Sequence, residues 1–397
     1  MKNIFLLVLD SVRRDFFFDS FLSQLNELKN DFVQFTNCHS IYTSTCLSHY
    51  TIFFGDYFGK ARNQNFPAQL KNFGYKSRSF CNGAIIRLYP LKGNLEPSLN
   101  NKLPYRNDII RDLGIEPAFN WNRELFGSKF EDYTECADDE KNKISEKWKK
   151  YIIDNKERKN IIFLHFWNTH HNYNINEYLK AKIEGENIKE IGQNLLAKII
   201  NKEITEKFVK KVYSTRIYEI LSTYIKDLIK LLKENNIYTD SLIIITSDHG
   251  EGLGDIGFHF TKRLHKFYDK IKNFILMNYN EIIQKRLRFL PKIKTFYLSK
   301  YDFFTFYHSG QFKLQKQIPL LVKFPNNEFG GKFYDNKVSL FDIIHTVNNL
   351  IDKKIKIGNF YGHSLYSLLK EGETSREKYK LDVEIKKLIT LEKLKGI

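Results

Sequence analysis

The chain has few cysteines and no apolar run long enough to span a bilayer. Its four cysteines form no Cys-x-x-Cys pair, which excludes a disulfide-rich secreted scaffold and favours a reducing compartment. The N-terminus leads directly into an apolar strand, without the charged and cleavable regions of a signal peptide. We therefore expect a cytoplasmic protein without a transmembrane segment.

A nucleic-acid-binding motif is also missing, although the formal net charge is +17. Lysine is spread along the whole chain rather than clustered, so we expect no nucleic-acid partner. One segment, at about residues 261–306, is both basic and aromatic. It is interpreted as a solvated helical excursion, with attraction of an anionic substrate or peripheral contact with a membrane surface as the alternatives.

The sequence does contain an alternation of apolar strands and amphipathic helices. With 397 residues, of which 42% are hydrophobic, the chain can bury a large core. The apolar run 4–9 and the Ile-rich run 241–247 lack polar alternation, which is typical of parallel strands covered on both faces. Residues 208–232 show the broad apolar face of a long helix. We therefore predict an α/β fold with a mainly parallel sheet and helices on both of its faces.

Two of the predicted strands end abruptly in acidic residues. The run 241–247 is followed by Asp248, His249 and a glycine-rich loop, and the first run is followed by Asp10. In open α/β sheets, ligands gather beyond the carboxyl ends of the strands. Two carboxylates at one edge are costly unless a cation lies between them, so the pattern indicates a metal site. Each motif alone could equally be a strand that ends in polar turn residues.

A polar segment, residues 43–49, leads into a short predicted helix that ends at Gly55. A hydroxyl at such an N-terminus meets backbone N–H groups and the positive end of the helix dipole, which suits a phosphate or sulfate group. Thr45 is the candidate nucleophile, because a bound divalent ion would lower the pKa of its hydroxyl. Taken alone, such a cluster of Ser and Thr is more often only a helix cap.

Together these segments resemble the sulfatase-like branch of the alkaline phosphatase superfamily, which includes sulfatases, phosphonate monoester hydrolases and phosphoglycerol or phosphoethanolamine transferases. The resemblance extends from Ile4 to about Leu369, and Ser247-Asp248-His249-Gly250-Glu251 is its most specific motif. It implies the alkaline phosphatase-like three-layer sandwich. The catalytic domain would cover residues 1–370, with insertions at about 92–158 and 261–306, and a charged C-terminal helix or tail at 371–397.

The resemblance also implies a site that binds one divalent metal ion and an anionic ester substrate. The ion would be Mn, Zn, Ca or Mg. Its implied ligands are Asp10, Thr45, Asp248 and His249. The implied catalytic residues are Thr45, His170 and His308. The candidates for substrate contacts are Ser48, His49, Asn168 and His259, of which His259 competes with His308 for its role.

Asn168 departs from the family pattern, which commonly has an acid at this position. Because Asn brings no charge to balance a dication, we expect one metal ion rather than two. His165 and His171 flank the segment that resembles the family motif. One of them is interpreted as a core or supporting residue, and His170 as the functional histidine.

The residues around Thr45 bear on the substrate. Sulfatases of this family mature a Cys or Ser in a Cys/Ser-x-Pro-x-Arg motif, and the corresponding run is Thr45-Cys46-Leu47-Ser48-His49. Cys46 is out of register, and Leu47 and His49 replace Pro and Arg. We therefore expect hydrolysis of phosphate esters through a covalent phospho-threonine. The alternatives are a transferase of a phospho-alcohol group onto a glycan or lipid precursor, a sulfuric ester hydrolase, and a non-catalytic anion-binding module.

Overall fold

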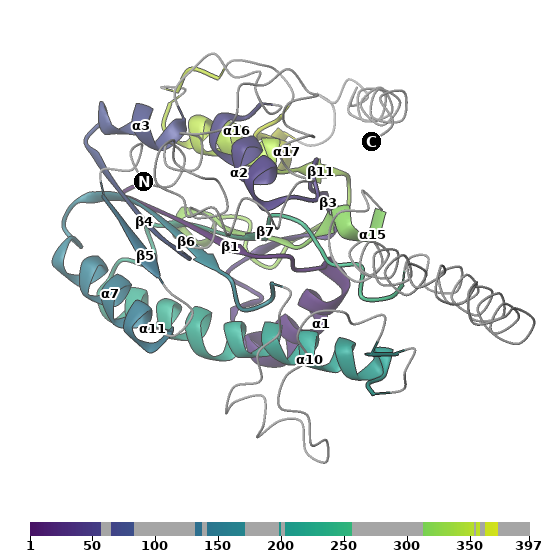
Figure 1. Ribbon diagram of the computed structural model, residues 1–397. Helices are drawn as coiled ribbons and strands as arrows, with labels where there is room; N and C mark the ends of the chain where they lie inside the picture. Colours follow the sequence, from purple (N-terminus) through teal and green to yellow (C-terminus); the bar gives the residue numbers. More distant parts are fainter. Residues whose placement is uncertain are drawn as a thin grey trace, which may run out of the picture.

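The computed structural model describes residues 1–56, 65–82, 132–136, 141–170, 198–199, 203–255, 313–352, 355–357 and 362–371 (Figure 1). Within this part of the chain, eight strands form one sheet in the order β10-β2-β9-β7-β1-β6-β4-β5. β9 is antiparallel to β2 and β7, and the other neighbouring strands are parallel. The strands are β1 (Asn3–Leu9), β2 (Val33–Phe35), β4 (Tyr75–Asn82), β5 (Asp132–Cys136), β6 (Lys159–Phe166), β7 (Leu242–Ser247), β9 (Leu320–Lys323) and β10 (Phe333–Tyr334).

A second, three-stranded sheet has the order β11-β3-β8. Its strands are β3 (Cys38–His39), β8 (Gln317–Ile318) and β11 (Val338–Ser339). They are short, and they lie beside the segment that leads into the predicted nucleophile (Figure 1). A single turn of helix, α15 (Lys313–Lys316), precedes β8.

Helices cover both faces of the large sheet, so the predicted three-layer α/β sandwich is confirmed (Figure 1). One layer consists of α1 (Arg14–Gln24), α7 (Lys141–Asp154), α10 (Glu206–Glu219) and α11 (Lys226–Glu234). The other consists of α2 (Thr45–Phe54), α3 (Phe66–Lys71), α16 (Phe341–Leu350) and α17 (Leu365–Glu371). Among the described helices, none has the length and apolarity needed to cross a membrane.

The central strand β1 contributes side chains to both cores, because successive residues of a strand point to opposite faces. Phe5, Leu7 and Leu9 pack in the core shared with α1, α7, α10 and α11. The alternate residues Ile4, Leu6 and Val8 pack in the core shared with α2, α3, α16 and α17. The absence of polar alternation in β1 is therefore the signature of a strand buried on both sides.

The helix predicted over residues 208–232 is present as α10 and α11, which a π-helical segment, Ile220–Ile225, joins without a break. The predicted insertion over 92–158 stays a prediction. Within its second part, β5 is the edge strand of the main sheet, parallel to β4, and α7 buries Trp148 in the core. The second predicted insertion, 261–306, lies outside the described residues.

Three strands deliver their carboxyl ends to one edge of the sheet. Leu9 is in register with Phe166 of β6 on one side and with Ser247 of β7 on the other. The residues that follow these strands, Asp10 and Asp248 among them, therefore lie side by side. The Asp10 N–H donates to the Phe166 carbonyl at 2.9 Å, which holds the first turn after β1 against β6.

Gly55 ends α2 in the left-handed region, at φ 66°, and a Cβ there would lie 2.6 Å from Cγ2 of Ile344 in α16. We expect Gly55→Ala to lower the free energy of unfolding by about 2–4 kcal/mol, from the unfavourable φ and the overlap together. The matched control is Gly74→Ala, with φ 80° and nothing within 4 Å of the added Cβ. It should cost about 1 kcal/mol, for the backbone alone. Urea unfolding measures both, and equal losses would contradict the packing argument.

Candidate metal centre

Asp10 and Asp248 each have one carboxylate oxygen held by neighbouring protein donors. The other oxygen lies near Thr45 or His249, with Oδ2 of Asp10 3.3 Å from Thr45 Oγ1 and Oδ2 of Asp248 3.5 Å from His249 Nε2. Oδ1 of Asp248 accepts the backbone N–H groups of Ser11 at 2.9 Å and His249 at 2.8 Å. Oδ1 of Asp10 accepts the Ser11 hydroxyl at 2.6 Å. Both carboxylates are fully buried. Holding one oxygen of each fixes the direction in which the second oxygen points, as partners outside the metal shell do for metal ligands.

The backbone of Ser11 is bent to make these contacts. Its φ is 60°, in the left-handed region that is unfavourable for a residue with a side chain. Tyr213 of α10 holds the turn from the other side, since its hydroxyl donates to the Ser11 carbonyl at 2.6 Å and accepts the Arg13 N–H at 2.8 Å. The strained turn is therefore fixed from both Asp248 and α10.

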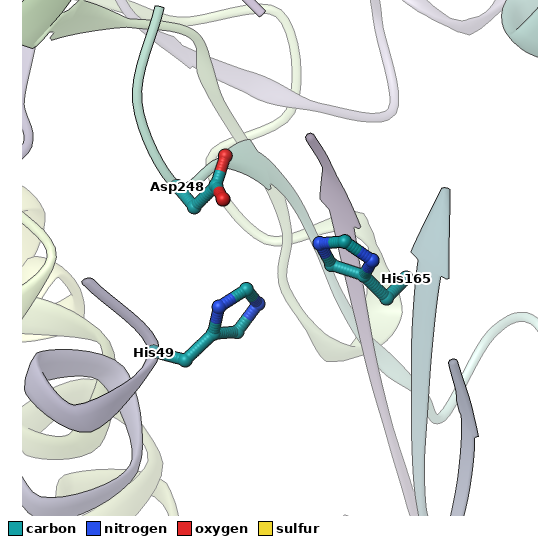
Figure 2. Close-up of side chains that lie close together, drawn as sticks. All are labelled: His49, His165 and Asp248. Atoms are coloured by element: carbon teal, nitrogen blue, oxygen red, sulfur yellow. The ribbon is translucent and has the colours of Figure 1, made fainter. Parts of the chain in front are cut away.

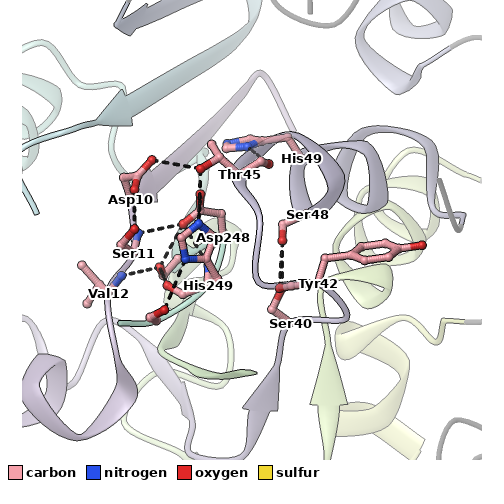
Figure 3. A network of polar contacts seen from close by, with 12 residues as sticks. Asp10, Ser11, Val12, Ser40, Tyr42, Thr45, Ser48, His49, Asp248 and His249 are labelled. Atoms are coloured by element: carbon pink, nitrogen blue, oxygen red, sulfur yellow. Dashed lines mark hydrogen bonds and ion pairs between the residues drawn. The ribbon is translucent and has the colours of Figure 1, made fainter. Parts of the chain in front are cut away.

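Thr45 is the first residue of α2 and is 8% exposed. Its Oγ1 lies 3.3 Å from Oδ2 of Asp10 and 3.2 Å from Nε2 of His249 (Figure 3). The hydroxyl has one proton and cannot donate to both atoms at once. His249 Nδ1 lies 3.3 Å from the Gly250 carbonyl, which can only accept, so Nδ1 carries the ring proton and Nε2 has the free electron pair.

Two further histidines lie at the same edge of the sheet (Figure 2). His165 Nε2 is 3.4 Å from Oδ2 of Asp10, and the rings of His165 and His49 are 4.9 Å apart between centroids. His165 belongs to β6, where it lies beside Val8 of β1. His49 belongs to α2, one turn after Thr45.

Burial dominates the electrostatics of the site. It raises the pKa of Asp10 well above its ordinary value, and the neighbouring charge of Asp248 adds to this effect. Burial lowers the pKa of His49 to about 4 and the pKa of His165 well below its ordinary value. Both imidazoles are therefore uncharged near neutral pH. Asp248 differs from Asp10, because burial raises its pKa but interaction with the neighbouring histidines, His249 above all, outweighs burial and lowers it.

The donor set fits a divalent cation. One carboxylate oxygen from each of Asp10 and Asp248 and one ring nitrogen of His249 lie within 4.8 Å of one another. The Thr45 hydroxyl lies among them. Two carboxylates, one imidazole with a free electron pair and one hydroxyl are ligands that Mn²⁺ and Zn²⁺ accept. An ion there would also balance the charge that burial leaves uncompensated.

The sequence matches the family model described as Sulfatase over residues 2–353, which is most of the chain. The chain belongs to the sulfatase family. No curated protein sequence matches it.

Several solved structures share the fold of this sulfatase-family chain. The phosphonate monoester hydrolase of Agrobacterium radiobacter is similar with a TM-score of 0.57 and 14% identity, covering 96% of this chain and 79% of that one. The C-terminal periplasmic domain of EptC from Escherichia coli has a TM-score of 0.52 and 14% identity, covering 88% and 81%. The soluble domain of lipooligosaccharide phosphoethanolamine transferase A from Neisseria meningitidis has a TM-score of 0.52 and 15% identity, covering 88% and 87%.

The structure brings together the four predicted metal ligands, Asp10, Thr45, Asp248 and His249, from β1, α2 and the loop after β7. The predicted substrate contact His49 lies beside them. Their roles as ligands, nucleophile and substrate contact stay predictions.

Other predicted residues lie elsewhere. The hydroxyl of Ser48 turns toward the preceding loop, 3.0 Å from Oγ of Ser40 and 3.2 Å from the Tyr42 carbonyl (Figure 3). Asn168 contacts Tyr224 in the π-helical segment. His170 is half-buried and stacks on Trp167, with ring centroids 3.8 Å apart. The predicted residues His259 and His308 lie outside the described residues.

Of His165 and His171, one was interpreted in the sequence as a core or supporting residue, and the structure places His165 at the site, with Nε2 3.4 Å from Oδ2 of Asp10. A signal was available. Residues 161, 163 and 165 share one face of β6, and Phe163 packs in the core beneath α2. The same parity directs His165 toward α2 and the site.

Replacing Asp10 tests whether the buried carboxylates are arranged for a cation. Metal-free Asp10→Asn should be at least as stable as metal-free wild type, because one of two repelling buried charges is removed. The rise in Tm that Mn²⁺ produces in wild type should be lost. Thermal unfolding with and without Mn²⁺ measures both effects.

The matched control is Asp342→Asn. Asp342 is also fully buried, but its oxygens accept the backbone N–H groups of Ser339 and His363, each at 2.7 Å. This variant should lower the Tm with and without Mn²⁺ and keep the rise on adding the ion. An undiminished Mn²⁺ effect in Asp10→Asn would show that Asp10 is not a ligand.

Proposed function

We propose that this sulfatase-family chain is a metal-dependent hydrolase of phosphate esters that acts through a covalent phospho-threonine at Thr45. The family assignment places it among sulfatase-like hydrolases and transferases. The observation that carries the finer proposal is the position of the Thr45 hydroxyl. It lies 3.3 Å from Asp10 and 3.2 Å from His249, at the N-terminus of a helix.

The start of α2 supplies a second feature for an anionic substrate. The Ser48 N–H donates to the Ser44 carbonyl at 3.0 Å, as expected for the first full turn of the helix. The preceding N–H groups, from Thr45 to Leu47, point toward the N-terminal end, where the helix dipole is positive. A phosphoryl group held against Thr45 would meet these groups, which stabilise the charge on its oxygens.

When bound, a divalent ion at Asp10, Asp248, His249 and Thr45 would supply Lewis-acid chemistry, which lowers the pKa of the hydroxyl and neutralises charge on the ester. The Thr45 proton leaves toward Oδ2 of Asp10, which lies 3.3 Å from Oγ1. A carboxylate oxygen that ligates an ion keeps a second electron pair for this proton, whereas Nε2 of His249 has only one pair. Oγ1 of Thr45 then forms a bond to phosphorus while the bond from phosphorus to the alcohol oxygen breaks in line.

The departing alcohol takes a proton from a histidine acting as general acid, and the same histidine accepts a proton from the water that later cleaves the phospho-threonine. His170 and His308 are the candidates from the sequence. Of the two, only His170 lies in the part of the chain that the structure describes. It comes shortly after the end of β6, the strand that contains His165, and its ring stacks on Trp167. The atoms balance as one ester and one water giving an alcohol and a phosphate.

The identity of residue 45 supports phosphate over sulfate as the substrate. A threonine hydroxyl is a sufficient nucleophile for phosphorus once its pKa is lowered. The neighbouring residues Leu47 and His49 do not match the sulfatase maturation motif. Similar folds include a phosphonate monoester hydrolase and phosphoethanolamine transferases, and the EptC domain has been solved in complex with Zn. The cytoplasmic location and the anionic ester substrate stay predictions from the sequence.

The test is turnover of p-nitrophenyl phosphate, bis-p-nitrophenyl phosphate, a phenylphosphonate monoester and p-nitrophenyl sulfate by chelator-stripped protein, before and after Mn²⁺ is restored. We expect metal-dependent turnover of a phosphorus ester, and a loss of at least about 10³-fold in kcat in Thr45→Ala. The control is Thr51→Ala in the same helix, whose hydroxyl bonds the Leu47 carbonyl at 3.2 Å and should keep full turnover.

The remaining outcomes separate the alternatives. Preferred turnover of the sulfate ester would contradict the proposal in favour of a sulfuric ester hydrolase. Product formation that requires an added acceptor alcohol and still depends on Thr45 would identify a transferase. Metal binding without turnover of any ester, with or without an acceptor, would leave an anion-binding module.

A further inference from the structure

We propose that His49, His165 and Asp248 form a second divalent-cation site, which shares Asp248 with the first site. This proposal deepens the proposed function, on which it rests through Asp248, and its test separates the two. The three side chains come from α2, from β6 and from the loop after β7, and they converge in Figure 2.

The ligand atoms are close enough for one ion. One nitrogen from each histidine and one oxygen of Asp248 lie within 4.8 Å of one another. Two ligands about 2.1 Å from a tetrahedral ion are about 3.4 Å apart, so closing around a cation needs shifts on the order of 1 Å. The side chains of His165 and Asp248 are completely buried, and His49 is 0% exposed.

His49 is oriented as a metal ligand would be. Its Nδ1 lies 2.6 Å from the carbonyl of Thr45. A carbonyl only accepts, so Nδ1 carries the proton and donates it, and Nε2 has the free electron pair. A histidine that ligates a metal commonly donates its other ring N–H to a backbone carbonyl in this way. The partner carbonyl belongs to the proposed nucleophile, so the two sites share one turn of α2.

His165 and Asp248 supply the second observation. Within the described part of the chain, neither ring nitrogen of His165 makes a hydrogen bond, and neither does Oδ2 of Asp248. His165 Nε2 lies 3.4 Å from Oδ2 of Asp10 without a hydrogen bond between them. Buried polar atoms without hydrogen bonds are costly and rare. A cation between His165 and Asp248 would satisfy both.

Aromatic packing alone does not account for two imidazoles at this place. The His49 ring contacts the ring of Phe163 edge-on, with centroids 5.6 Å apart, and it stacks on Phe53 at 6.3 Å. Phenyl rings would fill these contacts without bringing buried nitrogens. Two imidazoles and a shared carboxylate are instead a donor set for borderline ions such as Zn²⁺ or Mn²⁺.

The position differs from the one that the sequence suggests. In the family pattern, a second ion would use residues around His170, and Asn168 weakens that site because it replaces an acid. In the structure Asn168 contacts Tyr224 and His170 stacks on Trp167. The second site proposed here instead uses His165 within β6, five residues before His170. When bound, an ion at these residues would supply further Lewis-acid chemistry beside Thr45.

The experiment measures metal content and coupling rather than activity. Chelator-stripped protein is saturated with Mn²⁺, freed of unbound ion and assayed for manganese per chain by mass spectrometry, and its EPR spectrum is recorded. Wild type should hold two ions per chain with the spectrum of an exchange-coupled pair. His165→Gln and His49→Gln should each hold one ion and show an uncoupled spectrum. The matched control His345→Gln, in α16 and outside both clusters, should keep two coupled ions.

One ion per chain in wild type, or two without coupling, overturns the proposal, and this result does not depend on whether a variant folds. Circular dichroism verifies the folded state of each variant. Two coupled ions in both His165→Gln and His49→Gln also overturn it. One ion per chain together with Thr45-dependent phosphate ester turnover would contradict the second site and support the proposed function. Two coupled ions without turnover would support the second site and contradict the proposed function.

Discussion

Two carboxylates buried at one edge of a sheet are the constraint on which this site depends. Asp10 and Asp248 are both 0% exposed, so water does not screen their charges. The protein directs one oxygen of each to N–H and hydroxyl donors, and the other oxygen lies near Thr45 or His249. The left-handed backbone of Ser11 and the hydroxyl of Tyr213 hold this orientation. A cation completes an arrangement that is otherwise electrostatically costly.

The sheet topology makes the constraint possible. β1 lies between β6 and β7, and all three run in the same direction, so the residues after them meet at one edge. α2 adds Thr45 and His49 from the layer above, one turn of helix apart. The nucleophile, the helix N-terminus and the carboxylates are therefore positioned by buried, regular elements, which suits a site that must hold charged groups in fixed geometry.

Asp248 has a central position between two groups of ligands. Oδ1 is bound by two backbone N–H groups, and the histidines 49, 165 and 249 surround the carboxylate. A single ion would use His249 and leave the pair His49 and His165 without a chemical role at the sheet edge. A second ion gives that pair a role and compensates for the acid that Asn168 replaces.

Much of this followed from local sequence patterns. The unbroken apolar strands, the amphipathic helix of residues 208–232 and the acids at strand ends are properties of neighbouring residues, so they predicted the three layers and pointed to Asp10 and Asp248. The family resemblance added Thr45 and His249. The inclusion of β5 and α7 in the central layers was missed, because their apolar stripe is narrow and is recognised only against β4. The placement of His165 beside Asp10 and His49 was decided by the tertiary structure alone. Strand register and helix packing bring together residues more than 100 positions apart, and no local pattern encodes that distance.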